Sequence, residues 1–115
     1  VVVSGDSHNS WAFDLPEDGR PAGVEFGGQS VSSPGIESAT VGIDPARIAK
    51  DILARHTQEL RWVATSNRGY MHLSLSPKAA TNEWVFMDTV KEVSSKTKPS
   101  QRMQVRPGRK VLEQA

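Results

Sequence analysis

The residues with the clearest chemical potential are a carboxylate and an imidazole that lie close together near the start of the chain. Asp6 and His8 are two positions apart in the string Gly5-Asp6-Ser7-His8. Aspartate and histidine together suit hard or borderline metal ions. The chain has no cysteine, so any metal here must be held by oxygen and imidazole. The structural alternative is an aspartate that caps a turn and a histidine that packs nearby, and spacing alone favours it.

A buried strand is predicted to position this pair. Residues 1–3 are all valine and run into Ser4-Gly5-Asp6, a pattern typical of a central strand that is buried on both faces. Ligand sites in α/β sheets gather at the carboxyl ends of such strands, which is where Asp6 and His8 would lie. The chain opens on this strand without an initiator Met or a signal peptide, so we expect it to be a fragment of a longer protein.

Turn residues and hydrophobic periodicity predict two hairpins joined by a loop. Residues 10–28 form the first, with Asp18-Gly19 at its tip. Residues 27–37 are rich in Gly and Ser and predict a loop that is long enough to favour a functional role. Residues 69–76 and 82–90 alternate in polarity and form the second hairpin.

One helix is predicted between the hairpins. Asp44 can cap it and Pro45 fits its first position. An apolar stripe follows at helical spacing, and the helix is expected to fade over residues 56–59. The stripe consists of Ile48, Ala49, Ile52 and Leu53.

Composition divides the chain and limits its partners. Residues 1–90 are predicted to form one part of a domain, and residues 91–115, which lack aromatic residues, a basic and poorly ordered C-terminal tail. A net charge of +1 provides no general attraction to nucleic acid or anionic membranes. No apolar run approaches the roughly 18 residues of a membrane span.

Five ordered blocks of sequence resemble PhoD-like alkaline phosphatases (alkaline phosphatase D). The similarity runs over residues 1 to about 90, and several blocks at appropriate separations are more specific than any single motif. The blocks are Ser4 to Trp11, Val24 to Phe26, Ser30 to Gly35, Thr65 to Met71 and Glu83 to Asp88.

The resemblance implies a fold and an activity. The fold is α/β, the C-terminal part of a metallophosphoesterase-like β-sandwich flanked by helices, as in purple acid phosphatases and calcineurin-like enzymes, with one main helix and β-hairpins here. The activity is two-metal hydrolysis of phosphate mono- or diesters, with iron and calcium as the metals. The last metal motif of that superfamily is typically Gly-His-x-His, and Asp6 and His8 occupy its two ligand positions. A periplasmic or secreted location is also implied.

The sequence departs from the family pattern in two places. The other ligands come from upstream segments, one of Asp-Asp-His-Glu type, and this chain has none of them. Two ligands cannot build a two-metal site, so we expect the chain alone to be inactive. Ala64 stands where relatives often place Asp before the Thr-Ser pair.

Three further residues are candidates for supporting the site or contacting substrate. Asn9 could accept a hydrogen bond from a ligating imidazole, or could serve only its own turn. Arg68 could brace the site loops or meet phosphate, although a solvated turn arginine is the favoured alternative. Ser33, like Ser32, could contact substrate or metal-bound water, but a structural Ser-Pro-Gly turn explains both equally well.

The remaining histidines and the tryptophans are predicted to be structural. His56 ends the predicted helix, and His72 lies on the polar side of a strand. Trp11, Trp62 and Trp84 are expected to fill the core.

Two other functions remain open. The basic tail could bind a polyanion through phosphate contacts, but nucleic acid is disfavoured because no aromatic residues interleave its charges. The chain could also be a non-catalytic structural module that self-associates through exposed strand edges. The tail's charges are Lys96, Lys98, Arg102, Arg106, Arg109 and Lys110.

Overall fold

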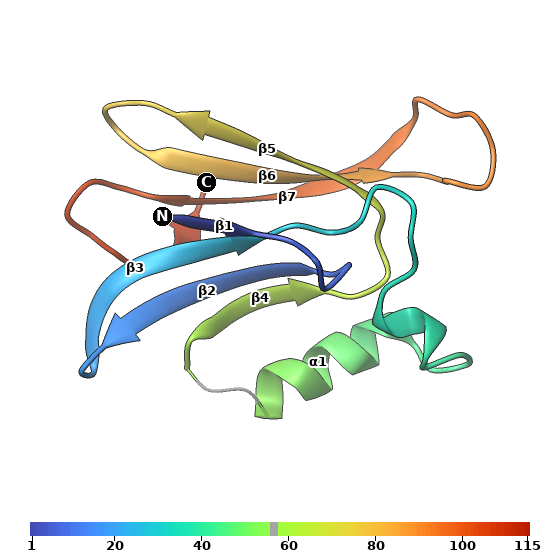
Figure 1. Cartoon of the computed structure of the whole chain (residues 1–115), viewed down its shortest axis with the longest axis horizontal. Coiled ribbons are helices and arrows are strands. Elements are labelled where there is room, and N and C mark those ends of the chain that lie inside the picture. Colours follow the sequence, from blue (N-terminus) through green and yellow to red (C-terminus); the bar gives the residue numbers. More distant parts are fainter. Residues whose placement is uncertain (56–57) are drawn as a thin grey trace.

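Two four-stranded sheets face each other, and one α-helix lies beside the first of them (Figure 1). The computed structural model describes residues 1–55 and 58–115. The first sheet has the order β1-β3-β2-β4 and the second the order β5-β6-β7-β8. This arrangement confirms the predicted α/β sandwich with one main helix and hairpins. The strands are β1 (Val2–Ser4), β2 (Ser10–Glu17), β3 (Arg20–Gly27), β4 (Leu60–Ala64), β5 (Gly69–Leu75), β6 (Ala80–Met87), β7 (Thr97–Val105) and β8 (Glu113–Gln114).

Both predicted hairpins are present. The β2–β3 hairpin turns at Asp18 and Gly19, whose φ angles of 48° and 73° are those of a tight two-residue turn. The β5–β6 hairpin pairs Met71 with Trp84, so these two residues lie on the same face of the second sheet. β4 was not predicted, and it extends the first sheet by pairing with β2.

The first strand differs from the prediction of a central, doubly buried strand. β1 pairs in parallel with β3 and lies at the edge of its sheet. Val1, Val2 and Val3 are 62%, 47% and 53% exposed. Apolar residues favour burial, but a strand is buried on both sides only where it has neighbours on both sides. Within the described residues, β3 is the only strand that pairs with β1.

The C-terminal segment also differs from the prediction, because it is not a poorly ordered tail. It forms β7 and β8, and Met103, Val105 and Leu112 are buried in the core. The backbone N–H of Leu112 donates to Asp14 Oδ1 at 2.7 Å, which ties this segment to β2 of the other sheet. The segment is polar in composition, but it forms a strand because it can pair with β6 and bury its alternating apolar residues.

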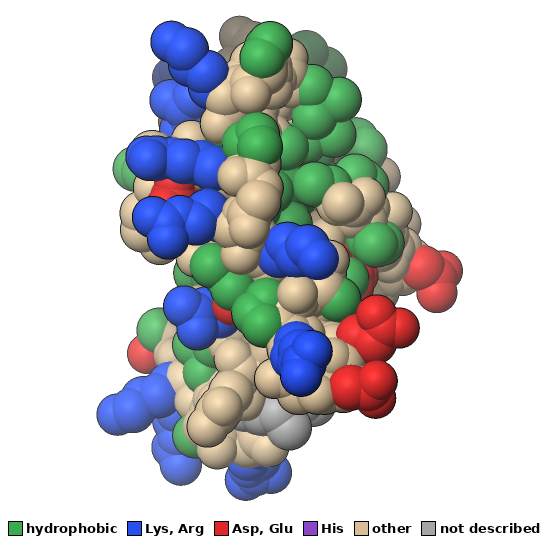
Figure 2. Space-filling model, turned by 90° about the vertical axis from the view of Figure 1, so that its left-hand side faces the viewer, with side chains coloured by type: hydrophobic (Ala, Val, Ile, Leu, Met, Phe, Trp, Pro, Cys, Tyr) green, Lys and Arg blue, Asp and Glu red, His purple; other side chains and the backbone are tan. Residues whose placement is uncertain are grey.

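The basic residues of this segment do not form a separate tail, since Lys98 and Arg102 lie on β7. At the end of the molecule that carries the β2–β3 and β5–β6 turns, Lys and Arg are interspersed with hydrophobic side chains, and the most exposed acidic side chains lie on one side (Figure 2). Some positive charge is paired, since Arg106 contacts Glu113 and Arg102 lies near Glu83.

The core lies between the two sheets around two large aromatic side chains. Phe26 and Trp84 are fully buried and meet edge to face, with ring centroids 5.7 Å apart. Trp62 packs on Trp84 at 4.8 Å. Asn82 is also fully buried, and its side-chain amide has no hydrogen-bond partner in the part of the chain that the structure describes.

The helix begins as predicted. α1 spans Pro45–Arg55, and the N–H of Ala46 donates to the Asp44 carboxylate at 3.0 Å. Ile48, Ala49 and Ile52 are half-buried, whereas Leu53 is exposed. No helix in the described part of the chain has the length and apolar character to cross a membrane.

Candidate functional site

A cleft of about 330 Å³ lies at the carboxyl end of β1, where the sequence predicted a site. Three segments that are far apart in sequence form it: the loop after β1, the loop after β3 and the start of β5. Asp6 and His8 both line it, so the structure brings the two predicted metal ligands to one cavity. The lining residues are Ser4, Gly5, Asp6, His8, Gly28, Gln29, Ser30, Val31, Gly69, Tyr70 and Met71.

Asp6 and His8 adopt a backbone conformation that is uncommon for residues with side chains. Their φ angles are 68° and 58°, in the left-handed region, which costs about 1–2 kcal/mol for each L-residue. The loop between them is held by a hydrogen bond from the Ser7 N–H to the Gly5 carbonyl at 2.8 Å. Trp11 Nε1–H donates to Ser7 Oγ at 2.6 Å. Strained residues of this kind cluster at functional sites, where the surrounding contacts hold the unfavourable backbone conformation in place.

The imidazole of His8 is oriented by a backbone oxygen. Its Nδ1 lies 2.9 Å from the carbonyl oxygen of Pro34. A carbonyl can only accept a hydrogen bond, so Nδ1 must carry the proton in this contact. In the neutral ring, Nε2 then keeps its lone pair, which is the form that binds a metal.

Asn9 supports the loop in a different way from the one predicted. It is buried, and its Nδ2 donates to the Ser7 carbonyl at 2.6 Å. Its Oδ1 accepts from the Ile36 N–H at 3.2 Å. The oxygen that receives the His8 ring proton therefore belongs to Pro34, while Asn9 joins the loop after β1 to the loop after β3.

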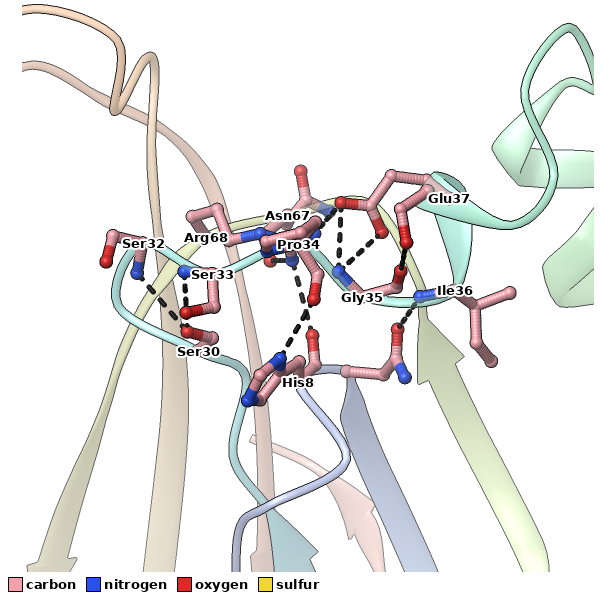
Figure 3. A network of polar contacts seen from close by, with 12 residues as sticks. His8, Ser30, Ser32, Ser33, Pro34, Gly35, Ile36, Glu37, Asn67 and Arg68 are labelled. Atoms are coloured by element: carbon pink, nitrogen blue, oxygen red, sulfur yellow. Dashed lines mark hydrogen bonds and ion pairs between the residues drawn. The ribbon is translucent and has the colours of Figure 1, made fainter.

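Arg68 is buried, so it is not the solvated turn residue that the sequence favoured. Its side chain is 8% exposed, and Nη2 forms an ion pair with Glu37. Nη1 donates to the Asn67 carbonyl at 2.5 Å and to the His8 carbonyl at 3.3 Å. Burial lowers the pKa of Arg68 below its ordinary value. Figure 3 shows the network in which Arg68 and Glu37 lie over the His8 loop, with Pro34 and Gly35 beside them.

Two glycines make this close packing possible. A Cβ at Gly35 would lie 2.5 Å from Asn9 Oδ1 and 2.7 Å from the His8 carbonyl oxygen. Gly69 has a φ of 151°, and a Cβ there would lie 1.9 Å from the carbonyl oxygen of Val85. Both positions therefore require the absence of a side chain.

Sequence reasoning missed two residues that join the site to its surroundings. Glu37 accepts the Gly35 N–H at 3.1 Å as well as pairing with Arg68. Gln29 is buried and links the two sheets: its Nε2 donates to the Val85 carbonyl at 3.2 Å, and its Oε1 accepts from Ser10. No sequence motif surrounds Glu37. Gln29 follows a Gly-Gly pair, but such a pair indicates only that another part of the backbone can approach closely.

The remaining sequence candidates lie outside the cleft or outside the described residues. Ser33 is exposed, and its N–H donates to Ser30 Oγ at 2.8 Å. His72 is exposed on β5, opposite Glu83 on β6. His56 lies outside the described residues.

The donor types in the cleft fit a metal ion, but their number does not make a complete centre. Aspartate oxygen suits calcium, and carboxylate with imidazole suits iron. Within residues 1–55 and 58–115, no three His, Cys, Asp or Glu side chains are grouped as metal ligands would be. Asp6 and His8 can thus contribute to a metal site but do not form one by themselves.

Comparison with known proteins gives one match. A sequence model of a family described as PhoD-like phosphatase matches residues 1–84. No curated protein and no solved structure matches the chain. The matched range contains every residue that lines the cleft, together with Glu37 and Arg68.

Proposed function

Because the chain belongs to the PhoD-like phosphatase family, we propose that it forms part of a metal-dependent phosphoesterase site in which Asp6 and His8 are metal ligands. Membership indicates a phosphatase-type function at the level of the family. The proposal adds the ligands, the metals (iron and calcium) and the two-metal hydrolysis of phosphate mono- or diesters. The remaining ligands would come from a segment or chain beyond the residues described.

The observation that carries this proposal is the shared position of Asp6 and His8. Both residues line one cleft, and both hold a left-handed backbone that the surrounding hydrogen bonds maintain. The contact with Pro34 leaves Nε2 of His8 as the nitrogen with a lone pair. A carboxylate and such a nitrogen on one short loop are suitable donors for a metal.

The protein's own part in the chemistry is to bind and orient. A bound metal pair would activate water and stabilise the charge on a phosphoryl group. The chain would supply two donors to that pair and fix their loop against the loop after β3. The cleft is also lined by Ser30 and Tyr70, which are residues with hydroxyl groups.

Manganese can test the ligands directly, because a paramagnetic ion broadens the NMR signals of nearby nuclei. We expect substoichiometric Mn²⁺ to broaden the amide signals of residues 4–8, 28–31 and 69–71 before those of β7 and β8. Asp6→Asn and His8→Gln should each weaken the binding by more than the roughly 10–100-fold that is typical of losing an outer-shell partner. Asp18→Asn and His72→Gln are matched controls, because both residues are exposed and do not line the cleft.

Broadening centred elsewhere, or unchanged in Asp6→Asn and His8→Gln, would refute the ligand assignment. Hydrolysis of p-nitrophenyl phosphate with iron and calcium added completes the test. We expect no turnover by the chain alone, because the described residues provide only two grouped donors. Turnover that is lost in both variants would show that a complete centre assembles from this chain, contrary to our expectation.

A location outside the cytoplasm, periplasmic or secreted, is proposed from the family alone. Fractionation of cells that express the complete gene product would test it. Recovery with cytoplasmic marker enzymes would contradict it.

The exposed β1 edge favours self-association as a second candidate function. Val2 and Val3 of β1, and Val1 just before it, are about half-exposed, and in the described chain β1 pairs only with β3. Such an edge can pair with a strand of another copy. Light scattering over a range of concentrations distinguishes a dimer or larger assembly from the monomer, and a monomer at every concentration would remove this candidate.

A further inference from the structure

Arg68 is separated from His8 by 60 positions in sequence, yet it contacts the His8 backbone. Its side chain is 8% exposed, and its guanidinium is engaged by Glu37 and by the carbonyl oxygens of Asn67 and His8. Because its guanidinium lies against these three acceptors, and because it does not line the cleft, Arg68 is poorly placed to meet a phosphate group there.

We propose that Arg68 and Glu37 form a positioning pair that holds the imidazole of His8 with Nε2 free for a metal. This inference rests on the proposed function for its purpose, but the geometry that it describes can be measured without a metal. The pair acts on the imidazole through two backbone connections that meet at His8.

The first connection runs through the main chain of His8 itself. Arg68 Nη1–H donates to the His8 carbonyl at 3.3 Å. That carbonyl belongs to a residue with a φ of 58°, so the bond helps to stabilise a conformation that an L-residue does not favour. Without it, His8 can relax toward ordinary backbone angles, and its side chain would then leave its present direction.

The second connection runs through the loop after β3. Both carboxylate oxygens of Glu37 accept the Gly35 N–H, each at 3.1 Å. Gly35 follows Pro34, whose carbonyl accepts from Nδ1 of His8 at 2.9 Å. Arg68 holds Glu37 by the ion pair, so the oxygen that selects the imidazole tautomer is fixed indirectly by the same guanidinium (Figure 3).

Packing leaves little room for alternatives to this arrangement. The contacts that a Cβ would make at Gly35 show that the loop rests directly on Asn9 and His8. The forced conformation at Gly69 fixes the chain immediately after Arg68. A guanidinium also presents two nitrogens in a fixed fork, which a lysine ammonium lacks.

The experiment measures the tautomer of His8 by long-range ¹H–¹⁵N NMR at about pH 8.5, where neutral imidazole is the main form in solution. A protonated ring nitrogen and a ring nitrogen with a lone pair have well-separated ¹⁵N shifts, and His8→Gln assigns the ring. We expect the native chain to show the Nδ1–H form. The double variant R68M/E37Q removes both charges together, so it leaves no unpaired ion. It should shift the tautomer ratio toward Nε2–H by up to about tenfold, the effect of losing one hydrogen bond.

A second measurement connects this geometry to metal binding. Affinity for Mn²⁺ at the cleft should fall about 10–100-fold in R68M/E37Q, the usual effect of removing a partner that orients a ligand. Arg68→Lys should change the tautomer ratio of His8 and the affinity for Mn²⁺ in the same direction as R68M/E37Q, but by a smaller factor. Arg61→Met is the matched control, because Arg61 pairs with Asp14 away from the cleft, and it should change neither.

The outcomes separate the positioning role from the proposed function. The indole N–H of Trp84, which donates to the Gly27 carbonyl at 2.8 Å, reports that the sandwich is intact. An intact R68M/E37Q variant with an unchanged tautomer ratio overturns the inference. If that variant does not fold, Arg68→Lys decides by the same ratio. If the native chain binds no Mn²⁺ at the cleft, the proposed function fails, while the tautomer ratio still decides the role of Arg68.

Discussion

The loops around His8 and the core around Trp84 are held together by different forces. The loops are joined by side-chain hydrogen bonds and one partly buried ion pair, with carbonyl, amide and carboxylate oxygens as acceptors. The core is joined by apolar packing, in which Trp84 meets Phe26 and Trp62. Its buried polar residue, Asn82, has an amide without a partner among the described residues.

This difference teaches that geometry and stability are set in separate regions of the molecule. Apolar burial is strong but has little directional preference, so the core can stabilise the sandwich without fixing the direction of one imidazole. Hydrogen bonds add less net free energy but specify direction. The following variants test this separation.

The largest loss of stability is expected from Trp84→Ala in the core. Removing a fully buried tryptophan leaves a cavity and should lower the free energy of unfolding by about 3–5 kcal/mol. Urea unfolding monitored by circular dichroism measures it. Leu75→Ala, on a side chain that is 73% exposed, is the control and should change the free energy little. A small loss in Trp84→Ala would show that the core is not the main source of stability.

Gly69→Ala should change both the stability of the protein and the geometry of His8, because Gly69 belongs to both regions. The new Cβ would collide with the Val85 carbonyl, and the φ of 151° is strained for any L-residue. Adding the conformational and overpacking costs gives a loss of about 2–5 kcal/mol. The tautomer ratio of His8 should change in the same variant, since Arg68 precedes this position.

Gly19→Ala is the matched control for that change. Gly19 also has a positive φ, 73°, but a Cβ there would meet no atom within 4 Å. We expect only the conformational cost, about 1 kcal/mol, and an unchanged His8 signal. Equal losses in the two variants would mean that the contact with Val85 relaxes freely.

Asn82→Leu should stabilise the core. The substitution removes an amide that is fully buried without a partner and replaces it with an apolar side chain of similar size. We expect the free energy of unfolding to rise by about 1–3 kcal/mol in thermal or urea unfolding. A loss instead would indicate that an ordered water satisfies the amide, and Thr65→Val tests the same principle at another buried, unpartnered oxygen.

Arg61→Gln should have the smallest effect. Arg61 pairs with Asp14 at 3.3 Å but is 48% exposed, so solvent screens the pair. We expect a loss of about 0–1 kcal/mol that diminishes with added salt. A larger, salt-independent loss would mean that Asp14 needs this cation to keep its hydrogen bond with Leu112.

The sequence was most informative where structure depends on neighbours along the chain. The Asp18-Gly19 turn and the Asp44 cap are local features, and the hairpin and the helix were predicted from them. β4, β7 and β8 were missed, and the burial of β1 was predicted wrongly, because each depends on a partner strand from elsewhere in the chain. When two strands that are distant in the chain pair, the sequence of each strand alone gives only a weak indication of the pairing.

The candidate site divides in the same way. Asp6 and His8 are close in sequence, so their shared loop could be predicted at the end of β1. The contacts of Arg68 with His8 and Glu37 cross 60 and 31 positions, and no spacing rule links such residues. Bracing of the site loops was one of the functions considered for Arg68, but burial was needed to favour it over a solvated turn.

The bridge made by Gln29 has a consequence for the order in which the protein is built. Its amide donates to carbonyls of Tyr70 and Val85, the second of which is 56 positions later in the chain. All four strands of the first sheet have been synthesised by Ala64, which is 21 residues before Val85. At about 5–20 residues per second, a ribosome needs roughly one to four seconds to cover that distance. During this interval the first sheet lacks Trp84 of β6, which packs against Phe26 in the finished core. The start of β5, which is the last segment that lines the cleft, is made before β6.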